Sequence, residues 1–592
     1  MSDGGDAQQQ QQQLIQLLTA CVSPDEHTRK DAERMVQSSG AVFGFGDLLC
    51  RTAFGLDDVV DGHHHLNIPM DIRQLAALLL KKYVRERWQV GEHFFIEGEP
   101  MTSVEEKMAI RGKICAGLRM KDSKMRTACA LVIAQIATHD WPEEWEGLLG
   151  ELLVPIREKR DVDHVNGALR CMSMLCGDLE ERQLPKLVPE LFPDLFGLLQ
   201  ASDDGLNGID KDQMTMVKCR ALDVTRGCYS NLGMIGDDQI RFQIKEAAKP
   251  FLESNFVAYG NIFEFRSDVF ETAGGCTLTL SALKAMQATV QYFGKEITGG
   301  QVVSEQTFGG CVERFFHVFE KAANRYVQCR GVEVDALDDC EDDMGDKVSN
   351  AAVVTQCMEL AMTMIESTKI AKSCIQPRLK SLVSIAVATS LTTDDQLETW
   401  EDDVNQFVAD EEDDYQSVRA TSGIFLATAC AKFSKIFYVV FAEVVAELFS
   451  QSFEEQNNND ENWWRRREAA LLAVGSVSDE LVEQDKEAGG KNMSPAFDCN
   501  AFLNEIIRSE FTATPTSSNP FLKGRALWTA SRLAAAASAE GANAILDASV
   551  NALNDQSAQF PVKIGACRSL IAFVPMAIKS TQKSKKLSLI HI

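Results

Sequence analysis

A short pattern of small and apolar residues returns along the chain at an interval of about 40 residues. Each copy places a basic residue or a glycine beside an alanine and continues as an apolar run. Two pairs of copies are separated by 40 residues, Ala128 from Ala168 and Ala526 from Ala566. The copies are centred on Ala128, Ala168, Ala221, Ala420, Ala526 and Ala566. This recurrence predicts a fold built from repeated structural units rather than around a single core.

Each unit has the apolar spacing of two amphipathic helices. Apolar residues three and four positions apart predict helices over 123–138 and 143–153, and the next unit repeats them over 162–179 and 183–199. Helix pairs that recur every 40 to 47 residues or so are typical of HEAT-type repeats. Because each pair is apolar on two sides, stacking against its neighbours completes the core. The sequence therefore predicts an all-α fold, a HEAT/ARM-type superhelical solenoid.

The charge and apolar content of the chain limit its partners. Its 592 residues include 59 Lys and Arg against 86 Asp and Glu, a net charge of −27. A phosphate backbone needs a basic surface, so direct nucleic-acid binding is not expected. The longest apolar stretch, 436–449, contains Glu443 and Glu447, and the N-terminus lacks a signal-peptide pattern, so no membrane insertion is expected. The 17 cysteines include no CxxC pair and are expected to be reduced and mostly buried.

The sequence contains no convincing motif for catalysis, cofactor binding or metal binding. The stretch 489–491 (GGK) lacks the earlier glycine and the Ser or Thr of a phosphate-binding loop. The consecutive histidines His63, His64 and His65 point in different directions on any regular backbone, which favours a solvated loop. We therefore expect no enzyme activity, no catalytic residue, no cofactor and no metal site.

Four segments interrupt the helical pattern. The Gln-rich start predicts a disordered N-terminus over 1–22, and residues 57–69 read as a loop between helices. Residues 333–346 contain eight acidic residues, and residues 394–414 contain eleven, with no Lys or Arg in either segment. We expect both acidic segments to form loops on the solenoid, and the first of them is best explained as a solvated loop.

The second acidic segment differs from the first because aromatic residues are interleaved with its carboxylates. Trp400, Phe407 and Tyr415 would anchor the loop to the solenoid and orient the acidic side chains. A fixed acidic cluster attracts basic partners and speeds their encounter. Contact with a basic partner and a passive solvated loop both remain open. The candidate contact residues are Asp410, Glu411, Glu412, Asp413 and Asp414.

Several motifs, in the same order along the chain, resemble the importin-β (karyopherin-β) family. Residues 72–83 read IRQLAALLLKKY and lead to Trp88, similar to the second helix pair of that family. Residues 139–145 (HDWPEEW) and 519–528 (NPFLKGRALW) follow in the family's order. Together the motifs cover about 26–573 and are most like the importin-nine branch.

The resemblance implies a nuclear import receptor that shuttles between cytoplasm and nucleus. Such receptors act as monomers and bind Ran-GTP, phenylalanine–glycine nucleoporins and basic protein cargo such as histones or ribosomal proteins. Residues 23–120 would form the N-terminal domain and residues 121–578 the solenoid that follows it. By position in the motif, the Ran-binding role falls on Arg73, Gln74, Lys81, Lys82 and Arg85. We expect these residues on or beside the polar side of a helix that buries Leu75 and Leu79, where a solvated face without a partner is the alternative.

Two departures from the family pattern lead to further expectations. Family members have roughly twenty repeats, whereas 592 residues at about 40 each allow about fourteen. Residues 579–592 also match nothing that should follow Phe573, so we expect a chain truncated at its C-terminus, with a non-family tail. Three alternatives to an importer remain: a Ran-dependent exportin, a non-transport HEAT scaffold, and a binding protein like a histone chaperone.

Overall fold

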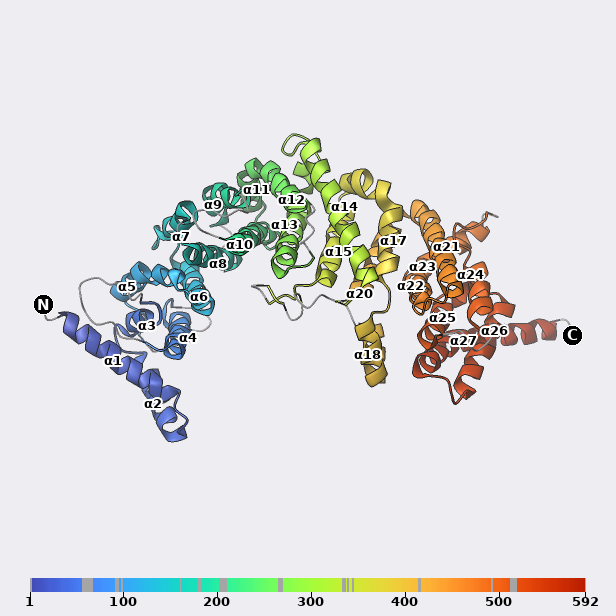
Figure 1. The fold of residues 1–592 in the computed structure, drawn as a ribbon, viewed down its shortest axis with the longest axis horizontal. Helices are drawn as coiled ribbons and strands as arrows, with labels where there is room; N and C mark the ends of the chain where they lie inside the picture. The colour runs from blue at the N-terminus through green and yellow to red at the C-terminus, as the bar shows by residue number, and fades with distance from the viewer. Residues whose placement is uncertain are drawn as a thin grey trace. The chain divides into compact units, whose positions relative to one another are not determined.

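The computed structural model is built from helices that follow one another along the chain (Figure 1). It describes residues 3–55, 68–90, 95–96, 100–159, 161–178, 183–201, 210–264, 270–332, 337, 340–342, 345–413, 417–490, 493–511 and 519–590. Within these residues the only β-structure is an isolated bridge between Glu341 and Lys347. The predicted all-α fold is confirmed.

The chain divides into two compact units. Unit 1 comprises Met1–Ile262 and Lys284–Thr307, and unit 2 comprises Phe263–Leu283 and Phe308–Ile592. The helices of unit 1 are α1 (Asp3–Cys21), α2 (Glu26–Ser39), α3 (Phe45–Phe54), α4 (Met70–Arg87), α5 (Val104–Ile114), α6 (Ser123–Asp140), α7 (Leu148–Glu158), α8 (Val162–Asp178), α9 (Leu184–Leu199), α10 (Lys211–Ser230), α11 (Asp238–Ala248) and α12 (Leu252–Ile262). Helix α13 (Ala273–Ile297) contributes to both units.

Unit 1 is a stack of helix pairs, as the repeat predicts. Helices α4, α6, α8 and α10 pack one against the next in a row, and α7, α9 and α11 form a second row. A buried arginine links successive repeats in the first row. Arg126 of α6 donates from Nη1 to the carbonyl oxygens of Met120 (2.7 Å) and Lys121 (2.8 Å) and to Asp163 Oδ1 of α8 (2.8 Å). In this copy of the pattern, the basic residue therefore joins α6 to the segment before it and to α8.

Unit 2 continues the same design. Its helices are α14 (Glu305–Gln328), α15 (Asn350–Glu366), α16 (Thr368–Ile370), α17 (Leu379–Thr389), α18 (Asp394–Asp402), α19 (Val404–Asp413), α20 (Val418–Phe433), α21 (Lys435–Asn457), α22 (Trp463–Ser476), α23 (Ser478–Gly490), α24 (Cys499–Ile506), α25 (Pro520–Arg532), α26 (Ala539–Asn554) and α27 (Phe560–Ile590). Helices α15, α20, α22, α25 and α27 pack in sequence as one row. The glycines of the pattern allow the closest approach, since a Cβ on Gly565 of α27 would lie 2.5 Å from the carbonyl oxygen of Gly524 of α25.

Several expected boundaries differ from the structure. Residues 3–21 form helix α1 rather than a disordered segment, because Leu14 and Leu18 are buried and the helix packs on α2, α3 and α4. Helix α7 begins at Leu148 rather than at 143, because the chain first turns through 141–147. Helix α27 continues to Ile590 without a separate tail, although side chains from residue 579 onward are not described. The expected loop at 57–69, with His63 to His65, lies almost wholly outside the described residues.

Helix α21 is the apolar stretch noted in the sequence. Among the described residues it is the one helix long and apolar enough to cross a membrane by length and composition. It packs on α17 and α22, and its Glu443 and Glu447 bind Lys380 Nζ at 3.1 and 2.7 Å. These contacts are those of a solenoid helix. The cysteines carry no disulfide, and most are buried, as predicted.

Candidate protein-binding surfaces

The exposed face of α4 carries most of the cations predicted to bind Ran. The buried face of the helix includes Ile72, Ala76 and Leu80, while Leu75 and Leu79, expected to form that face, are only half-buried. The buried face differs from the expected one because the helix packs against both α3 and α6. This pattern of burial determines which of the predicted cations are exposed to solvent.

Arg73 lies on the buried face of α4, contrary to the expectation that it belongs to the polar face. Its side chain is 6% exposed and donates from Nη1 to the carbonyl oxygens of Gly55 (2.9 Å) and Ala53 (3.4 Å). These carbonyls lie at the C-terminal end of α3, where helix carbonyls lack intrahelical partners. In this structure Arg73 therefore fastens α4 to α3.

The remaining predicted cations lie on the accessible side of α4. Lys81, Lys82 and Arg85 are exposed, and Gln74 is half-buried. Lys82 Nζ and Arg85 Nη2 lie 3.9 and 4.0 Å from Glu86 Oε1, distances at which an exposed pair contributes little. The cationic side chains of Lys81 and Lys82 are thus accessible to an acidic partner.

The motif residues that carry the family resemblance hold the first repeats together. Asp140 is buried and accepts hydrogen bonds from Trp88 Nε1 (3.0 Å) and from Arg111 Nη1 (3.0 Å). Arg111 also donates to the carbonyl oxygen of Glu144 (2.6 Å). These contacts join α4, α5 and α6. We conclude that the motif residues at 88 and 140 serve the fold rather than a ligand.

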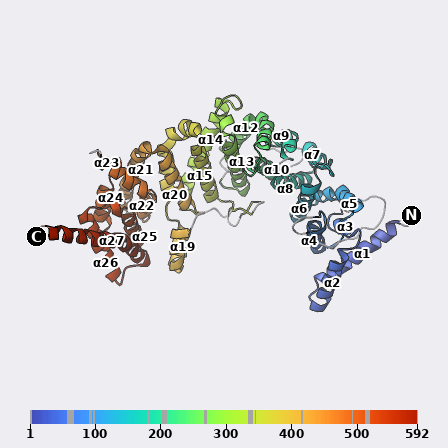
Figure 2. The same cartoon turned by 180° about the vertical axis from the view of Figure 1, so that it is seen from behind.

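The second acidic segment forms a pair of short helices, α18 and α19, instead of the expected loop. Thr393 begins α18 with a capping box, in which its hydroxyl accepts from Gln396 N and Gln396 Oε1 accepts from Thr393 N. The two helices project from the solenoid of unit 2 (Figure 1, and from behind in Figure 2). We call residues 394–413 the acidic hairpin.

Aromatic residues anchor the acidic hairpin, as the sequence predicts. Trp400 is 2% exposed, and its ring centroid lies 5.1 Å from that of Phe407. Both rings pack on Phe521 of α25, at 5.8 and 6.1 Å, and Phe407 also contacts Phe560 at 5.4 Å. Tyr415 lies outside the described residues. The hairpin is therefore fixed to the helices of two later repeats.

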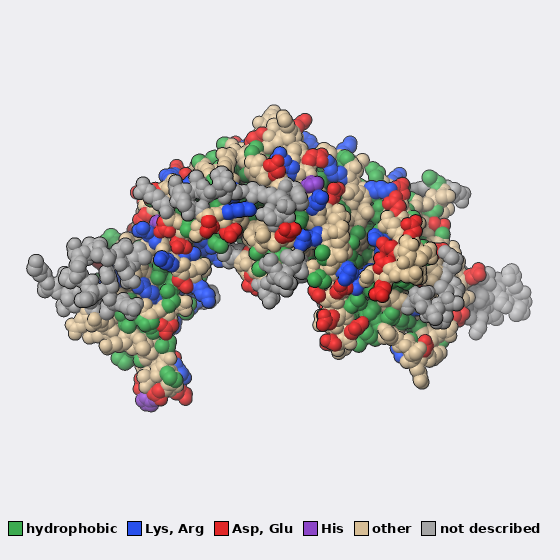
Figure 3. Space-filling view, in the orientation of Figure 1, with side chains coloured by type: hydrophobic (Ala, Val, Ile, Leu, Met, Phe, Trp, Pro, Cys, Tyr) green, Lys and Arg blue, Asp and Glu red, His purple; other side chains and the backbone are tan. Residues whose placement is uncertain are grey.

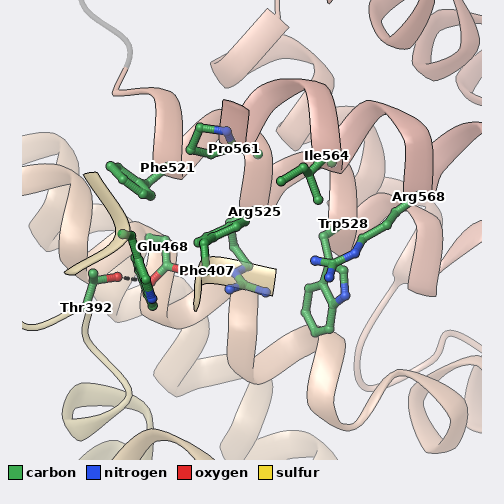
Figure 4. Close-up of a pocket in the computed structure, with 12 residues that line it drawn as sticks. Thr392, Phe407, Glu468, Phe521, Arg525, Trp528, Pro561, Ile564 and Arg568 are labelled. Atoms are coloured by element: carbon green, nitrogen blue, oxygen red, sulfur yellow. Dashed lines mark hydrogen bonds and ion pairs between the residues drawn. The ribbon is translucent and has the colours of Figure 1, made fainter. Parts of the chain in front are cut away.

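A buried carboxylate fixes the base of the hairpin. Glu468 of α22 accepts from Thr392 Oγ1 (3.1 Å), from Arg419 Nη1 of α20 (2.9 Å) and from Arg525 Nε of α25 (2.8 Å). Figure 4 shows the bond from Thr392 to Glu468, with Arg525 beside it. Burial acts to raise the pKa of Glu468, but the two arginines outweigh it and hold this pKa at about 2. Glu468 of α22 thus remains ionised, and its hydrogen bonds join α20 and α25 to Thr392, just before the acidic helices.

Two more arginines bind the start of the hairpin. Asp394 accepts from Arg330 Nε at 2.8 Å and from Arg465 Nη2, and Arg465 also donates to the carbonyl oxygen of Thr392. Five carboxylates between 395 and 403 face solvent. Figure 3 shows acidic side chains gathered over α18. The exposed ones are Asp395, Glu398, Glu401, Asp402 and Asp403.

The predicted cargo-contact residues are only partly described. Asp410 accepts from Trp400 Nε1 (2.8 Å) and Gln406 Nε2 (2.6 Å), which holds its carboxylate beside the anchoring ring. Glu411, Glu412 and Asp413 belong to α19, but their side chains lie outside the described residues, as does all of Asp414. The exposed acids of α18 were therefore missed as individual candidates, although the density of acids in the segment signalled them.

A groove lies beside the hairpin on the row formed by α20, α22 and α25. Its volume is about 400 Å³. It is lined by Gln396, Trp400, Asp410, Ser417, Arg419, Ala420, Gly423, Ile424, Ala427, Leu472, Ser476, Arg525 and Trp528. In the part of the chain that the structure describes, no group of three or more His, Cys, Asp or Glu is placed to hold a metal ion.

Two family models match the chain. The importin-beta N-terminal domain matches residues 64–119, which include α4 and the helix after it. The importin-9 central HEAT repeats match residues 375–592, which include the acidic hairpin and the groove. This second match also includes residues 579–592, which we expected to be a tail foreign to the family.

Known proteins with related sequences and structures are longer than this chain. Importin-9 of Drosophila melanogaster is 22% identical over 541 residues, which cover 90% of this chain and 48% of the relative. Lph2, a bidirectional nuclear transport receptor in S. cerevisiae, matches with a TM-score of 0.63 and 14% identity over 94% of this chain and 52% of its own. Kap121p bound to RanGTP matches with a TM-score of 0.53 and 16% identity over 95% of this chain and 48% of its own.

The chain spans about half the length of the proteins it matches. Both family models belong to the same group of proteins, and they match the two ends of the chain where the sequence motifs and the stacked helix pairs lie. Over these two matched segments, 64–119 and 375–592, the chain is similar to the importin-β (karyopherin-β) family.

Proposed function

We propose that this chain is a nuclear import receptor that binds basic protein cargo through unit 2 and Ran-GTP through unit 1. It has no catalytic activity of its own and acts as a monomer. It shuttles between cytoplasm and nucleus through contacts with phenylalanine–glycine nucleoporins. The observation that carries the proposal is the acidic hairpin, whose exposed carboxylates stand on a base fixed by buried ion pairs.

The hairpin's construction supports a binding role. Like charges close together on short helices repel one another, so these two helices need tertiary contacts to form. Phe521 provides such contacts to Trp400 and Phe407 within the hairpin, and Glu468 accepts from Thr392 just before it. A partner meets these carboxylates already in place and loses little conformational entropy in binding them. The chemistry that fits is a lysine- or arginine-rich protein surface, and histones or ribosomal proteins are cargo of this kind.

The cations of α4 support the Ran-binding part of the proposal. Lys81, Lys82 and Arg85 lie exposed on one helix of the matched N-terminal domain. Kap121p, which shares this fold, has been solved bound to RanGTP. We assign Ran contact to these three residues and to Gln74, and we remove Arg73 from the set because its guanidinium is buried against α3.

The competing functions make different predictions for one binding experiment. A complex of the 592-residue chain with a core histone dimer is titrated with Ran carrying a GTP analogue or GDP, and fluorescence anisotropy reports the bound cargo. An importer releases the histones with the GTP form only. Tighter binding with Ran-GTP indicates an exportin, a direction that a bidirectional relative such as Lph2 keeps open. Histone binding that ignores both forms of Ran indicates a scaffold or a chaperone and overturns the proposal.

A further inference from the structure

Two buried cysteines meet between successive helices of unit 1. Cys176 lies on α8 and Cys228 on α10, and both side chains are fully buried. Their sulfur atoms lie 3.2 Å apart, close enough for one thiol to donate a hydrogen bond to the other. The two helices pack against each other as neighbours in the first row of unit 1 (Figure 1). The thiol pair therefore joins two successive repeats at one point.

The backbones around the thiol pair are close enough for a covalent link. A Cβ placed on Gly227, the residue before Cys228, would lie 3.4 Å from the Cβ of Cys176. Asn231 donates from Nδ2 to the carbonyl oxygen of Cys176, which holds the end of α8 against the end of α10. A disulfide bond is about 2.05 Å long, so the two sulfur atoms need to approach each other by only about 1.2 Å. Small adjustments of the two side chains supply a movement of this size.

The thiol pair is closed to solvent but lies near the ends of its helices. Helix α8 ends at Asp178 and α10 at Ser230, each two residues beyond its cysteine. Each cysteine also adjoins a glycine, and one of the two glycines, Gly177, is exposed. Glycine lowers the stability of a helix, and helix ends open at a lower cost in free energy than the core does. Local opening of these two turns therefore exposes the thiols without unfolding the repeats.

The closed structure protects the thiols from reaction. The hydrogen bond to Cys228 and burial both raise the pKa of the Cys176 thiol, which keeps this thiol protonated. Since the thiolate is the reactive form, the thiol reacts only while the helix ends are open. After the first thiol has reacted, the second is already beside it, so the step that joins them is intramolecular.

We propose that Cys176 and Cys228 form an oxidation-sensitive staple, which hydrogen peroxide closes into a disulfide between α8 and α10. In the first step one thiolate attacks the peroxide, the O–O bond breaks, and a sulfenic acid and one water form with a proton from solvent. In the second step the other thiol attacks the sulfenic sulfur, the S–S bond forms, and a second water leaves. The two thiols lose two electrons in all, and the peroxide accepts them.

The disulfide restricts one interface of the stack. In a solenoid each repeat contacts only its neighbours, so a bond between two repeats limits their relative movement and leaves the other interfaces unchanged. The same bond reduces the conformational freedom of the unfolded chain and thereby stabilises the two repeats. The staple lies wholly within unit 1 and needs no bound partner. The inference therefore goes beyond the proposed function and does not depend on it.

Two other roles account for the thiol pair less well. A structural metal ion needs more ligands, and among the residues described no group of three or more His, Cys, Asp or Glu is placed to hold one. Apolar filling, the ordinary role of a buried cysteine, explains the burial but not the contact of two thiols across a helix interface. The experiment separates this second role from the staple.

The experiment treats the reduced full chain with hydrogen peroxide, blocks the remaining thiols by alkylation and digests the product. Mass spectrometry then detects peptides joined through Cys176 and Cys228 with the loss of two hydrogen atoms. Cys228→Ala removes one member of the pair, and Cys171→Ala, at another buried thiol of α8, is the matched control. Oxidation of the exposed Cys329 and Cys567 reports that the peroxide has acted. Hydrogen–deuterium exchange follows the ends of α8 and α10, and thermal unfolding checks that each variant folds.

We expect the joined peptides from the unaltered chain and from Cys171→Ala, but not from Cys228→Ala. Exchange at the ends of α8 and α10 should slow by about tenfold after oxidation and recover when a thiol reductant is added. Oxidation of Cys329 and Cys567 without the joined peptides would overturn the inference, because the buried thiols would then serve packing alone. Joined peptides with unchanged exchange would also overturn it, since the bond would not restrict the repeats. Equal yields of disulfides between other buried cysteines would indicate reaction of an unfolded chain and would overturn it as well.

Discussion

The two candidate surfaces, the cationic face of α4 in unit 1 and the acidic hairpin in unit 2, use their charges differently. On α4, the buried Arg73 serves the packing of α3, while Lys81 and Lys82 are exposed. On the hairpin, the carboxylate of Asp394 at the base is held by Arg330 and by the buried Arg465, and the exposed acids of α18 are displayed outward. Charges near the solenoid core therefore hold the repeats together, and the binding roles that we propose fall to the exposed charges.

The largest expected effect comes from Glu468, the buried carboxylate beneath the hairpin. Glu468→Gln leaves Arg419 and Arg525 buried without their counter-ion, which costs about 3–5 kcal/mol when a buried pair loses one partner. Urea unfolding followed by circular dichroism measures the loss in the transition of unit 2. The matched control is Glu398→Gln on the exposed face of α18, which we expect to change stability very little. Equal stability of the two variants would mean that the hairpin does not depend on the network below it.

The same variant predicts a change in acid sensitivity. The folded-state pKa of Glu468 is about 2, below its ordinary value of 4.5, so its stabilising contribution is fully present above about pH 4.5. That contribution is lost as the pH falls from there towards 2, because protons then bind the unfolded chain more readily than the folded one. The melting temperature of the unaltered chain should therefore fall more steeply in this window than that of Glu468→Gln. Parallel slopes would contradict the assignment.

A middle-sized effect tests the reassignment of Arg73. Arg73→Ala removes the donor to Gly55 and Ala53 and should lower the stability of unit 1 by about 1–3 kcal/mol, since the buried Ala53 carbonyl and the Gly55 carbonyl lose this partner. Lys82→Ala on the exposed side of the same helix should stay within about 0.5 kcal/mol of the unaltered chain. Thermal unfolding measures both. A variant at Arg73 that keeps full stability but loses Ran-GTP binding would restore Arg73 to the binding surface.

The sequence predicts the repeat more fully than the surfaces built on it. The 40-residue period and the small residues of the pattern follow from the geometry of helix stacking. In the structure Ala168 is fully buried, and Gly524 lies in close contact with the start of α27. The position of Arg73 could not be predicted, because a helix stacked on two sides buries a wider face than a single apolar stripe indicates. The helical hairpin was missed for a related reason. Its order depends on Phe521 and Glu468, which are distant in sequence, and on its own the segment has only the charge pattern of a solvated loop.

The smallest expected effect on stability is also the sharpest test of how the two surfaces differ. Reversing the exposed cations of α4 (Lys81→Glu, Lys82→Glu, Arg85→Glu) should weaken Ran-GTP binding by about tenfold or more, while histone binding stays within about twofold. Neutralising the exposed acids of α18 (Asp395→Asn, Glu398→Gln, Glu401→Gln) should do the reverse. Both sets change side chains at the surface, so melting temperatures should barely move. If either set of substitutions weakened the binding of Ran-GTP and of histones equally, net charge rather than position would govern recognition. The proposed division of roles between the two units would then be wrong.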